Sequence, residues 1–585
     1  MSQASSTNSP GGLVQSLTEK PAHALRRALR GGYGATDLRH DILAGLVVGV
    51  IALPLSMALG IASGVRPENG LYTAIVAGGL IAFFGGSRVQ VSGPTAAFVV
   101  ILAPIVQRFG IEGLLVATML AGIVLTIMGL ARLGRSVEFI PYPVVTGFTA
   151  GIAVVIATLQ VKDFLGLDIP SMPSEYVGKV HALATNLGTL HLPDLAIGVF
   201  TLFTLLFWPK VTRRVPSALV AISAAAALAY AAHRAWPGFD VATIRSRFGT
   251  PETPSGIPAS LPHFRWPWEW PGADGSPRAL TFELVRDVLP SAIAIAILGA
   301  IESLLSAVVA DGMTGHKHDP DAELLAQGLG NLASPFFGGI AATGAIARTA
   351  ANVRSGARSP IAAIVHALFL VVALLALAPL LGYLPMASMA ALLFIVAWNM
   401  GDFRHVIRVL RTSPRADVLV LLLCLFLTVI FDMVVAVIAG VALASVLLIR
   451  RVSELSSARL VGAEHHEALA ALPPGVAIYD VGGPLFFGAA QKAMAELELI
   501  ERVKVVVLDL RDVPAMDATG LVNLESATHT LERRGTRVIL AGLQPQPLET
   551  IRRALPHWHG RAPEVSDDVP DAIARAKSYM EATTP

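Results

Sequence analysis

The chain has few charged residues for its length and almost no cysteine. Only 15% of its 585 residues are Asp, Glu, Lys or Arg, where a soluble protein carries roughly a quarter. The formal net charge is only +2, which gives no electrostatic support for binding nucleic acid. The one cysteine, Cys424, lies in an apolar run, so a disulfide framework and a cysteine-based metal site are excluded. Residues 1–20 are polar and rich in serine, and without an apolar core we expect no cleavable signal peptide.

Apolar sequence dominates instead. The chain is 54% hydrophobic with a mean hydropathy of +0.63, as expected where side chains must match the hydrocarbon of a bilayer. The first run, 42–62, is long enough to cross about 30 Å at about 1.5 Å per residue. We predict fourteen spans, several of which are too short to cross the membrane alone. Such short spans are expected where Gly or Pro breaks a helix at a binding site. They are 42–62, 71–86, 94–107, 112–131, 141–161, 193–208, 215–233, 288–310, 326–337, 343–353, 360–380, 386–398, 416–431 and 433–449.

The distribution of basic residues predicts the orientation. With the N-terminus inside, the short outer loops carry only Arg66 and Arg108. The inner loops carry Arg88, Arg132, Arg135, Lys210, Arg213, Arg214, Lys317, Arg354, Arg358, Arg404, Arg408, Arg411, Arg415, Arg450 and Arg451. The long outer segments 162–192 and 234–287 are left out, because long loops follow this rule poorly. We therefore expect a multi-pass protein of a bacterial inner (cytoplasmic) membrane with both termini in the cytosol.

The composition changes after Arg451. Strand-like runs at 475–481, 503–510 and 536–541 alternate with a helical pattern at 521–533, which is typical of a small α/β domain. We therefore predict a cytosolic N-terminal segment at 1–40, a transmembrane transport domain at 41–451, a linker at 452–472 and a soluble cytosolic domain at 473–580.

The two halves of the membrane region look related. Residues 41–233 and 288–450 each contain seven predicted spans. Because seven is odd, the second half enters the membrane from the opposite side. The predicted fold is therefore a polytopic α-helical membrane protein of 7+7 inverted repeats, followed by a small α/β domain.

The third span of each half begins in the same way. A polar turn containing glycine runs directly into an apolar helix, at 92–98 and again at 343–349. A helix that begins inside the membrane has unpaired N–H groups and about +0.5 charge at its start. Two such helix starts that face each other form an anion site. Gly93 and Gly344, which have no side chain, would let a substrate approach the backbone there. Alternatively, these glycines only allow close helix packing.

One acidic residue, Glu302, lies in the middle of the run 288–310. A charged side chain there costs about 2.5–3.5 kcal/mol on insertion scales, so Glu302 is a functional candidate. Ser306 follows one helical turn later on the same face. The alternatives are a structural pair with Arg348 or a protonated, hydrogen-bonded acid.

Arg348 follows the start of the second broken helix by about one turn. Its guanidinium could add a full positive charge and hold an anionic group through two hydrogen bonds; alternatively, it stabilises an inner gate or the helix bundle. An ionised Glu302 would repel a dianion, so protonation of Glu302 would favour anion binding. Proton symport is therefore our hypothesis.

Several motifs resemble those of the SulP anion transporters, the bacterial relatives of solute carrier family 26. They lie at 52–58, 67–74, 91–97 and 344–352, and the loop 516–521 is similar to that of STAS domains. The resemblance extends from about residue 37 to 580. Within the family, residues 300–305, 390–393 and 396–400 most resemble the four-carbon dicarboxylate (succinate-type) transporters.

The resemblance implies a fourteen-helix fold with a core and a gate, an elevator mechanism and a homodimer. It implies that Glu302 and Ser306 couple transport to an ion or proton, and that the third and tenth helices, with the first alongside, enclose the substrate. The implied lining is Leu55, Ser56, Leu59, Thr95, Ala96, Phe98, Gly344, Ala345, Ile346, Ala347 and Arg348. Sodium-coupled bicarbonate relatives have a Thr where Ile346 stands, so we expect H⁺ as the coupling ion, with Na⁺ still possible.

The expected function is proton-coupled uptake of four-carbon dicarboxylates of the succinate, fumarate and aspartate class. The alternatives are a sulfate or sodium-coupled bicarbonate transporter of the same family, or a passive anion channel. An enzyme is disfavoured, since the spans hold no nucleophile–base pair and no metal cluster. The expected partners are a small anion, the lipid bilayer and a second copy, without nucleic acid, cofactor or metal.

The STAS-like segment is expected to bind or regulate. Ala518 stands where phosphorylation-controlled STAS domains have a serine, so phosphorylation there is excluded. Asp517 is expected to cap the helix that begins near Gly520. A cytosolic protein partner of this domain is possible.

Overall fold

The computed structural model describes residues 22–583 except 174, 213–214, 273–274, 277–279, 432, 456, 461–471, 473 and 487–502. The chain divides into two compact units, Met1–Val441 and Ala442–Pro585. Each unit is described by itself.

The first unit is helical apart from two short strands. Its elements are α2 (His23–Arg30), α3 (Ala35–Ala62), α4 (Pro67–Phe84), β1 (Ser92–Gly93), α5 (Ala96–Leu130), α6 (Tyr142–Leu165), α7 (Tyr176–Thr185), α8 (Leu192–Val211), α9 (Ser217–Ala235), α10 (Ile244–Phe248), α11 (Phe282–Thr314), α12 (Pro320–Ala333), β2 (Thr343–Gly344), α13 (Ile346–Arg354), α14 (Ile361–Leu381), α15 (Met386–Gly401), α16 (Phe403–Thr412) and α17 (Arg415–Ile430). Helix α18 (Met433–Leu455) runs from the first unit into the second.

Nine helices in the described part of the chain are long and apolar enough to cross a membrane. The fourteen predicted spans exceed that number because some fall on shorter or bent helices. Spans 94–107 and 112–131 both lie on α5, which bends at Gly110, where φ is +72°. Span 343–353 falls mostly on α13, which has only nine residues. The span count therefore stays a prediction.

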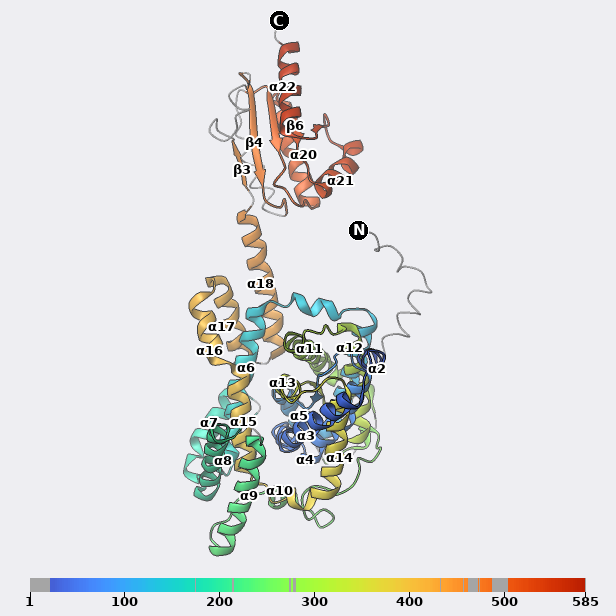
Figure 1. The fold of residues 1–585 in the computed structure, drawn as a ribbon. Helices are drawn as coiled ribbons and strands as arrows, with labels where there is room; N and C mark the ends of the chain where they lie inside the picture. Colours follow the sequence, from blue (N-terminus) through green and yellow to red (C-terminus); the bar gives the residue numbers. More distant parts are fainter. Residues whose placement is uncertain are drawn as a thin grey trace. The chain divides into compact units, whose positions relative to one another are not determined.

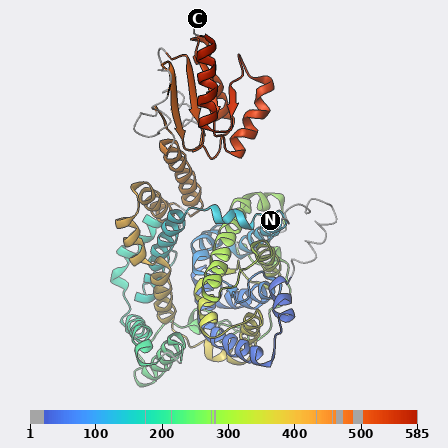
Figure 2. The ribbon, with the colours of Figure 1, turned by 45° about the horizontal axis from the view of Figure 1, so that its top comes forward.

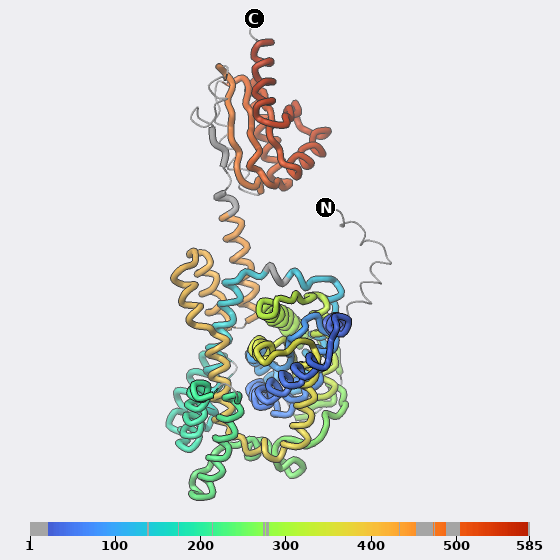
Figure 3. Tube along the Cα trace, viewed as in Figure 1, coloured from blue at the N-terminus to red at the C-terminus, as the bar shows by residue number. Residues whose placement is uncertain are grey.

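The helices of the first unit pack into two bundles (Figures 1 and 2). In the first bundle, α5 packs on α11 and α12, and α14 packs on α3 and α4. In the second, α15 packs on α6 and α8, and α17 packs on α6. Both halves of the sequence contribute to both bundles, as the colours along the chain in Figure 3 show. The division into a core and a gate that the family resemblance implies stays a prediction.

Three buried polar side chains of α12 hold the irregular segments of the first bundle. Glu323, Gln327 and Asn331 follow one another at intervals of four residues, so they share one face. The Glu323 carboxylate accepts hydrogen bonds from the backbone N–H groups of Gly86 (3.0 Å) and Ser87 (3.2 Å). It also accepts from the side-chain amides of Gln90 (2.9 Å) and Gln327 (3.0 Å). This carboxylate therefore fixes the segment that leads into β1.

Asn331 does the same for the segment that leads into β2. Its amide donates to the carbonyl of Ala342 over 2.8 Å, and its carbonyl accepts from the Ala342 N–H over 2.7 Å. Gln327 adds a bond to the Ser92 hydroxyl in β1 (3.1 Å). One helix thus satisfies backbone groups that would otherwise be unpaired inside the membrane.

The second unit is a sheet covered on both faces by helices (Figure 1). The strand order is β3 (Ser457–Leu460), β4 (Val476–Gly482), β5 (Val505–Asp509), β6 (Arg537–Ala541) and β7 (Glu564–Ser566), with β3 antiparallel and the others parallel. Val506 and Leu508 pack with α20 (Ala518–Arg533) and α21 (Pro545–Ala554), whereas Val505 and Val507 pack with α22 (Val569–Thr583). The predicted α/β class is confirmed.

Two details of this unit bear on the sequence predictions. The Asp517 carboxylate accepts from the Gly520 N–H over 2.7 Å and caps α20, as predicted. Strand β3 lies inside the range 452–472 that composition predicts as a linker. Its pairing with β4 brings it into the sheet, and composition does not reveal that pairing.

We predict that Glu323→Ala destabilises the protein by about 3 kcal/mol or more, because a buried donor left without an acceptor costs about 1–3 kcal/mol and four donors lose theirs. The midpoint of thermal unfolding of the full-length protein in detergent measures this. Glu283→Ala, on an exposed position of α11, is the control and should leave the midpoint unchanged. Equal midpoints for the two variants would show that Glu323 is not needed for this scaffold.

Candidate anion-binding site

The two polar turns predicted to form an anion site lie side by side. Strand β1 pairs antiparallel with β2, with Ser92 opposite Gly344 and Gly93 opposite Thr343. Each strand leads almost directly into a helix: α5 begins at Ala96 and α13 begins at Ile346. In Figure 1 both helices start within the first bundle. The two helix N-termini therefore lie near one another at the point where the strands meet, which we call the strand crossing.

These N-termini keep their N–H groups free of side-chain caps. Among the described residues, neither Thr95 before α5 nor Ala345 before α13 receives a capping hydrogen bond on its side chain. The Ala345 N–H itself donates to the Val91 carbonyl (2.9 Å), which extends the strand pairing. The first turn of each helix thus presents open N–H donors and its share of positive dipole charge.

Arg348 brings a full positive charge to the strand crossing. It lies in the first turn of α13 and is only 2% exposed. Its Nη2 donates to the Pro94 carbonyl, whereas its Nη1 has no hydrogen-bond partner in the described part of the chain. A Cβ atom on Gly93 would lie 2.8 Å from that Nη1. Glycine at this position therefore leaves room for the guanidinium.

Helix α11 is fastened to β2 and α13 by hydroxyl groups. The Ser303 hydroxyl lies 2.7 Å from that of Thr343 and accepts from the Gly344 N–H over 3.1 Å. The Ser306 hydroxyl lies 3.0 Å from that of Thr349, which accepts from the Val91 N–H. The sequence did not predict a role for Ser303, although it directly follows Glu302. A serine in an apolar run does not indicate which residue it will contact.

Glu302 is buried on α11 near the start of α5. The Thr95 hydroxyl lies close to its carboxyl group, yet has no hydrogen bond of ordinary geometry to a described residue. The ion pair between Glu302 and Arg348, one of the alternatives above, is absent from the described residues. Each of the two groups therefore keeps hydrogen-bonding capacity.

The remaining predicted lining residues fall into two groups. Leu55, Ser56 and Leu59 on α3, and Ala96 and Phe98 on α5, are buried. Within the described residues, the Ser56 hydroxyl has no hydrogen-bond partner, and α3 packs against α13.

Ile346 and Ala347, by contrast, are exposed at the start of α13, with Ile346 at 41%. The N-terminus of α13 is therefore open on one side, and Arg348 lies on the other.

His366 is a further group that sequence reasoning missed. It is buried on α14, its Nε2 has no partner among the described residues, and it lies close enough to Arg348 for electrostatic interaction. A single histidine in an apolar run predicts no role, because only the fold brings α14 near α13.

Comparison with known proteins identifies the family of the chain. The sequence model of the sulfate permease family matches residues 38–424, and that of the STAS domain matches residues 468–555. The chain belongs to the sulfate permease family. It is 41% identical over 529 residues to the putative sulfate transporter YvdB of Bacillus subtilis, covering 89% of this chain and 94% of that one. It is 32% identical over 538 residues to the bicarbonate transporter BicA of Picosynechococcus, covering 88% and 91%.

Solved structures agree with the fold. The structure of SLC26A9 matches with a TM-score of 0.82 at 17% identity, covering 100% of this chain and 98% of that one, which shows a shared fold. The transmembrane domain of a cyanobacterial BicA matches with a TM-score of 0.59 at 27% identity, covering 71% and 98%. This chain is thus a multi-pass membrane anion transporter of the SulP family with a C-terminal STAS domain.

The narrower resemblance to dicarboxylate transporters finds no support. YvdB, BicA and a further relative from Bacillus subtilis, YbaR, are named sulfate or bicarbonate transporters. The motifs that suggested it, at 300–305, 390–393 and 396–400, lie on α11 and α15, which pack on α5 and on α6 and α8 in this chain.

We predict that Gly93→Ala lowers anion transport about tenfold or more, because a side chain at φ +154° meets Arg348 and backbone strain costs about 1–3 kcal/mol. Gly79→Ala on α4 is the control, since its Cβ would meet only the Ala367 methyl at 3.6 Å. Anion flux into proteoliposomes at equal protein density measures both. If the Gly93 variant transports as fast as the Gly79 variant, the guanidinium does not need this space.

Proposed function

We propose that this chain transports a small inorganic oxyanion, sulfate first and bicarbonate second, and that the strand crossing holds it. The observation that carries the proposal is the Arg348 Nη1, buried beside Gly93 without a described partner. A buried cation is costly unless an anion accompanies it. The names of the relatives support the same substrate class.

The charge at the crossing favours a dianion. Each helix start contributes about +0.5, and Arg348 contributes a full charge. When Glu302 is protonated, the positive charge is therefore close to that needed to balance sulfate. The tetrahedral oxygens of sulfate also suit open N–H donors that converge from two helices.

Bicarbonate is the second candidate because of Glu302. If Glu302 is ionised, the net positive charge at the crossing falls by one, which suits a monoanion. The 32% identity to BicA of Picosynechococcus favours this candidate. Dicarboxylates are longer and need a second cationic group, and no similarity supports them.

We also propose that Glu302 couples transport to protons. Its carboxyl group is buried near Thr95, so protonation removes a negative charge close to where the anion would bind. A sodium ion would need several oxygen ligands. Ile346 supplies none where sodium-coupled relatives have a Thr, and the Ser306 hydroxyl is already bonded to that of Thr349. Proton coupling therefore remains the preferred hypothesis.

The remaining expectations complete the proposal. The first bundle carries the strand crossing and would move as a body against the second, as an elevator does. A homodimer would anchor the stationary bundle. The STAS domain would regulate transport through binding rather than phosphorylation, since Ala518 offers no hydroxyl. Both termini would lie in the cytosol of a bacterial inner membrane.

The test of the substrate is uptake of labelled sulfate into proteoliposomes, with unlabelled bicarbonate and succinate as competitors. We expect sulfate to accumulate against its gradient and bicarbonate to compete more strongly than succinate. Arg348→Gln should lower uptake about tenfold or more, as expected when a charged hydrogen bond worth about 1.5–3 kcal/mol is lost. Arg234→Gln, exposed on α9, should have no effect.

Two results would contradict the proposal. Strong competition by succinate alone would restore the dicarboxylate interpretation. Flux that never exceeds equilibrium under any imposed gradient would indicate a passive channel.

We predict that an acidic outer solution accelerates sulfate uptake by the wild type, because the proton that binds Glu302 enters with the anion. Glu302→Gln should transport at a rate independent of the pH gradient, since its side chain cannot ionise. Glu283→Gln, exposed on the same helix, should respond as the wild type does. A wild-type rate that follows a sodium gradient and ignores the pH gradient would disprove proton coupling.

A further inference from the structure

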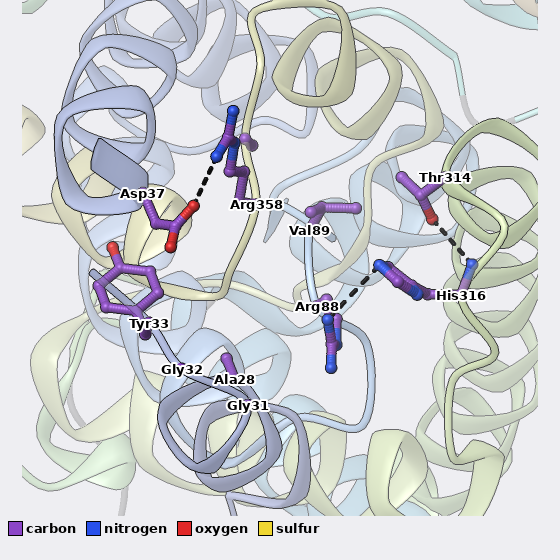
Figure 4. A pocket seen from close by; sticks show the side chains of 11 residues that line it. Ala28, Gly31, Gly32, Tyr33, Asp37, Arg88, Val89, Thr314, His316 and Arg358 are labelled. Atoms are coloured by element: carbon purple, nitrogen blue, oxygen red, sulfur yellow. Dashed lines mark hydrogen bonds and ion pairs between the residues drawn. The ribbon is translucent and has the colours of Figure 1, made fainter. Parts of the chain in front are cut away.

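A cavity of about 420 Å³ lies away from the strand crossing, on the face that the charge distribution predicts to be cytosolic. Four separate parts of the chain line it (Figure 4): the end of α2 with the loop into α3, the loop before β1, the end of α11, and the loop before α14. None of the residues that line this cavity belongs to the anion site proposed at the strand crossing.

The charged side chains of the cavity do not balance. Arg358 forms an ion pair with Asp37, with Nη1 and Oδ1 2.6 Å apart. Arg88 has no carboxylate partner among the described residues, and its Nη1 lies 3.4 Å from the Nε2 of His316. Figure 4 shows these as two separate pairs. One guanidinium therefore faces the cavity without an opposing negative charge.

The surroundings of Arg88 add positive charge. Burial, and to a lesser degree the charge of the neighbouring Arg27, lowers the pKa of Arg88. Burial raises the pKa of Tyr33 to about 12, so this phenol stays neutral. Its hydroxyl donates to Asp41 over 2.8 Å.

Asp41, in turn, is fully buried and accepts from the backbone of Arg358 and from Ser359. The Asp41 carboxylate, which holds Tyr33 and the segment of Arg358, is thus already committed to these donors.

A second cavity of about 560 Å³ shares His316. It is lined also by Arg135 and Lys317, while its one acidic residue, Asp311, is bonded to His318 over 2.8 Å. His316 therefore lies between two cavities whose uncompensated charge is positive in both.

The apolar exposure of the neighbouring helices places the first cavity at the level of a membrane surface. On α3, exposed apolar side chains begin at Leu38, directly after Asp37, and continue through Ile42 and Leu43. Such a row is typical of a lipid-facing helix. Helix α2 exposes Leu29 beside Arg30, which is typical of a helix that lies in the interface.

We propose that this cavity binds the phosphate group of an anionic phospholipid, with Arg88 and His316 as the ligands. Arg88 would donate two hydrogen bonds to phosphate oxygens. His316, released from Arg88, would donate a third through its Nε2. The apolar face of α3 would contact the acyl chains. Basic pockets beside membrane helices bind headgroups in this way.

The test measures thermal unfolding of the full-length protein in detergent with three probes: short-chain phosphatidylglycerol, short-chain phosphatidylcholine and inorganic phosphate. A ligand that binds only the folded state raises the midpoint. We expect phosphatidylglycerol to raise the wild-type midpoint more than phosphatidylcholine does. Arg88→Gln should lose most of that shift. Arg30→Gln, exposed on α2 outside the cavity lining, should keep it.

His316→Gln is the second variant and should also lose most of the shift, so the result does not depend on the folding of Arg88→Gln. If inorganic phosphate alone produces an Arg88-dependent shift of the same size, the site takes a soluble phosphate, which supports the shared chemistry. Equal shifts in the wild type, Arg88→Gln and His316→Gln with every probe would overturn the proposal. Transport of sulfate plays no part in this measurement, so either conclusion can fail without the other.

Discussion

The pairing of two strands of two residues each is the interaction on which the rest of the proposed anion site depends. It joins Ser92 to Gly344 and Gly93 to Thr343, residues separated in the sequence by more than half the length of the membrane domain. Because the strands are antiparallel and each leads into a helix, the pairing brings two positive helix starts together. Without it, the starts of α5 and α13 would be separate, ordinary helix ends. Arg348 would then not be buried where these starts meet.

Helices broken inside a membrane leave backbone groups unpaired, and this fold pairs them with side chains. Glu323 and Asn331 on α12 hold the segments before β1 and β2, and Ser303 on α11 holds β2 itself. Each bond connects a regular helix to an irregular segment. The irregular backbone around the proposed anion site is thereby hydrogen-bonded, and the cost of unpaired groups in hydrocarbon is avoided.

The buried charged side chains of the membrane unit fall into two groups that differ in how many of their hydrogen-bonding positions are filled. Arg348 and Glu302 both lie near the strand crossing without forming an ion pair among the described residues, which leaves each available for the role proposed above. Asp41 and Glu323, by contrast, are saturated with hydrogen bonds. A carboxylate whose acceptor sites are all filled serves the structure, whereas one with capacity to spare is available for transport.

The sequence alone was enough to predict the membrane class, the α/β class of the second unit, the Asp517 cap and the two glycine turns, because apolar runs, strand alternation and local caps are encoded in neighbouring residues. It could not determine the number of spans, since α5 continues through a bend at Gly110. Nor could it find the partners of Ser303, Glu323, His366 and Arg88. These partners emerge only in the folded chain, because each lies on an element distant in sequence, and a buried polar side chain shows its role only through what it contacts.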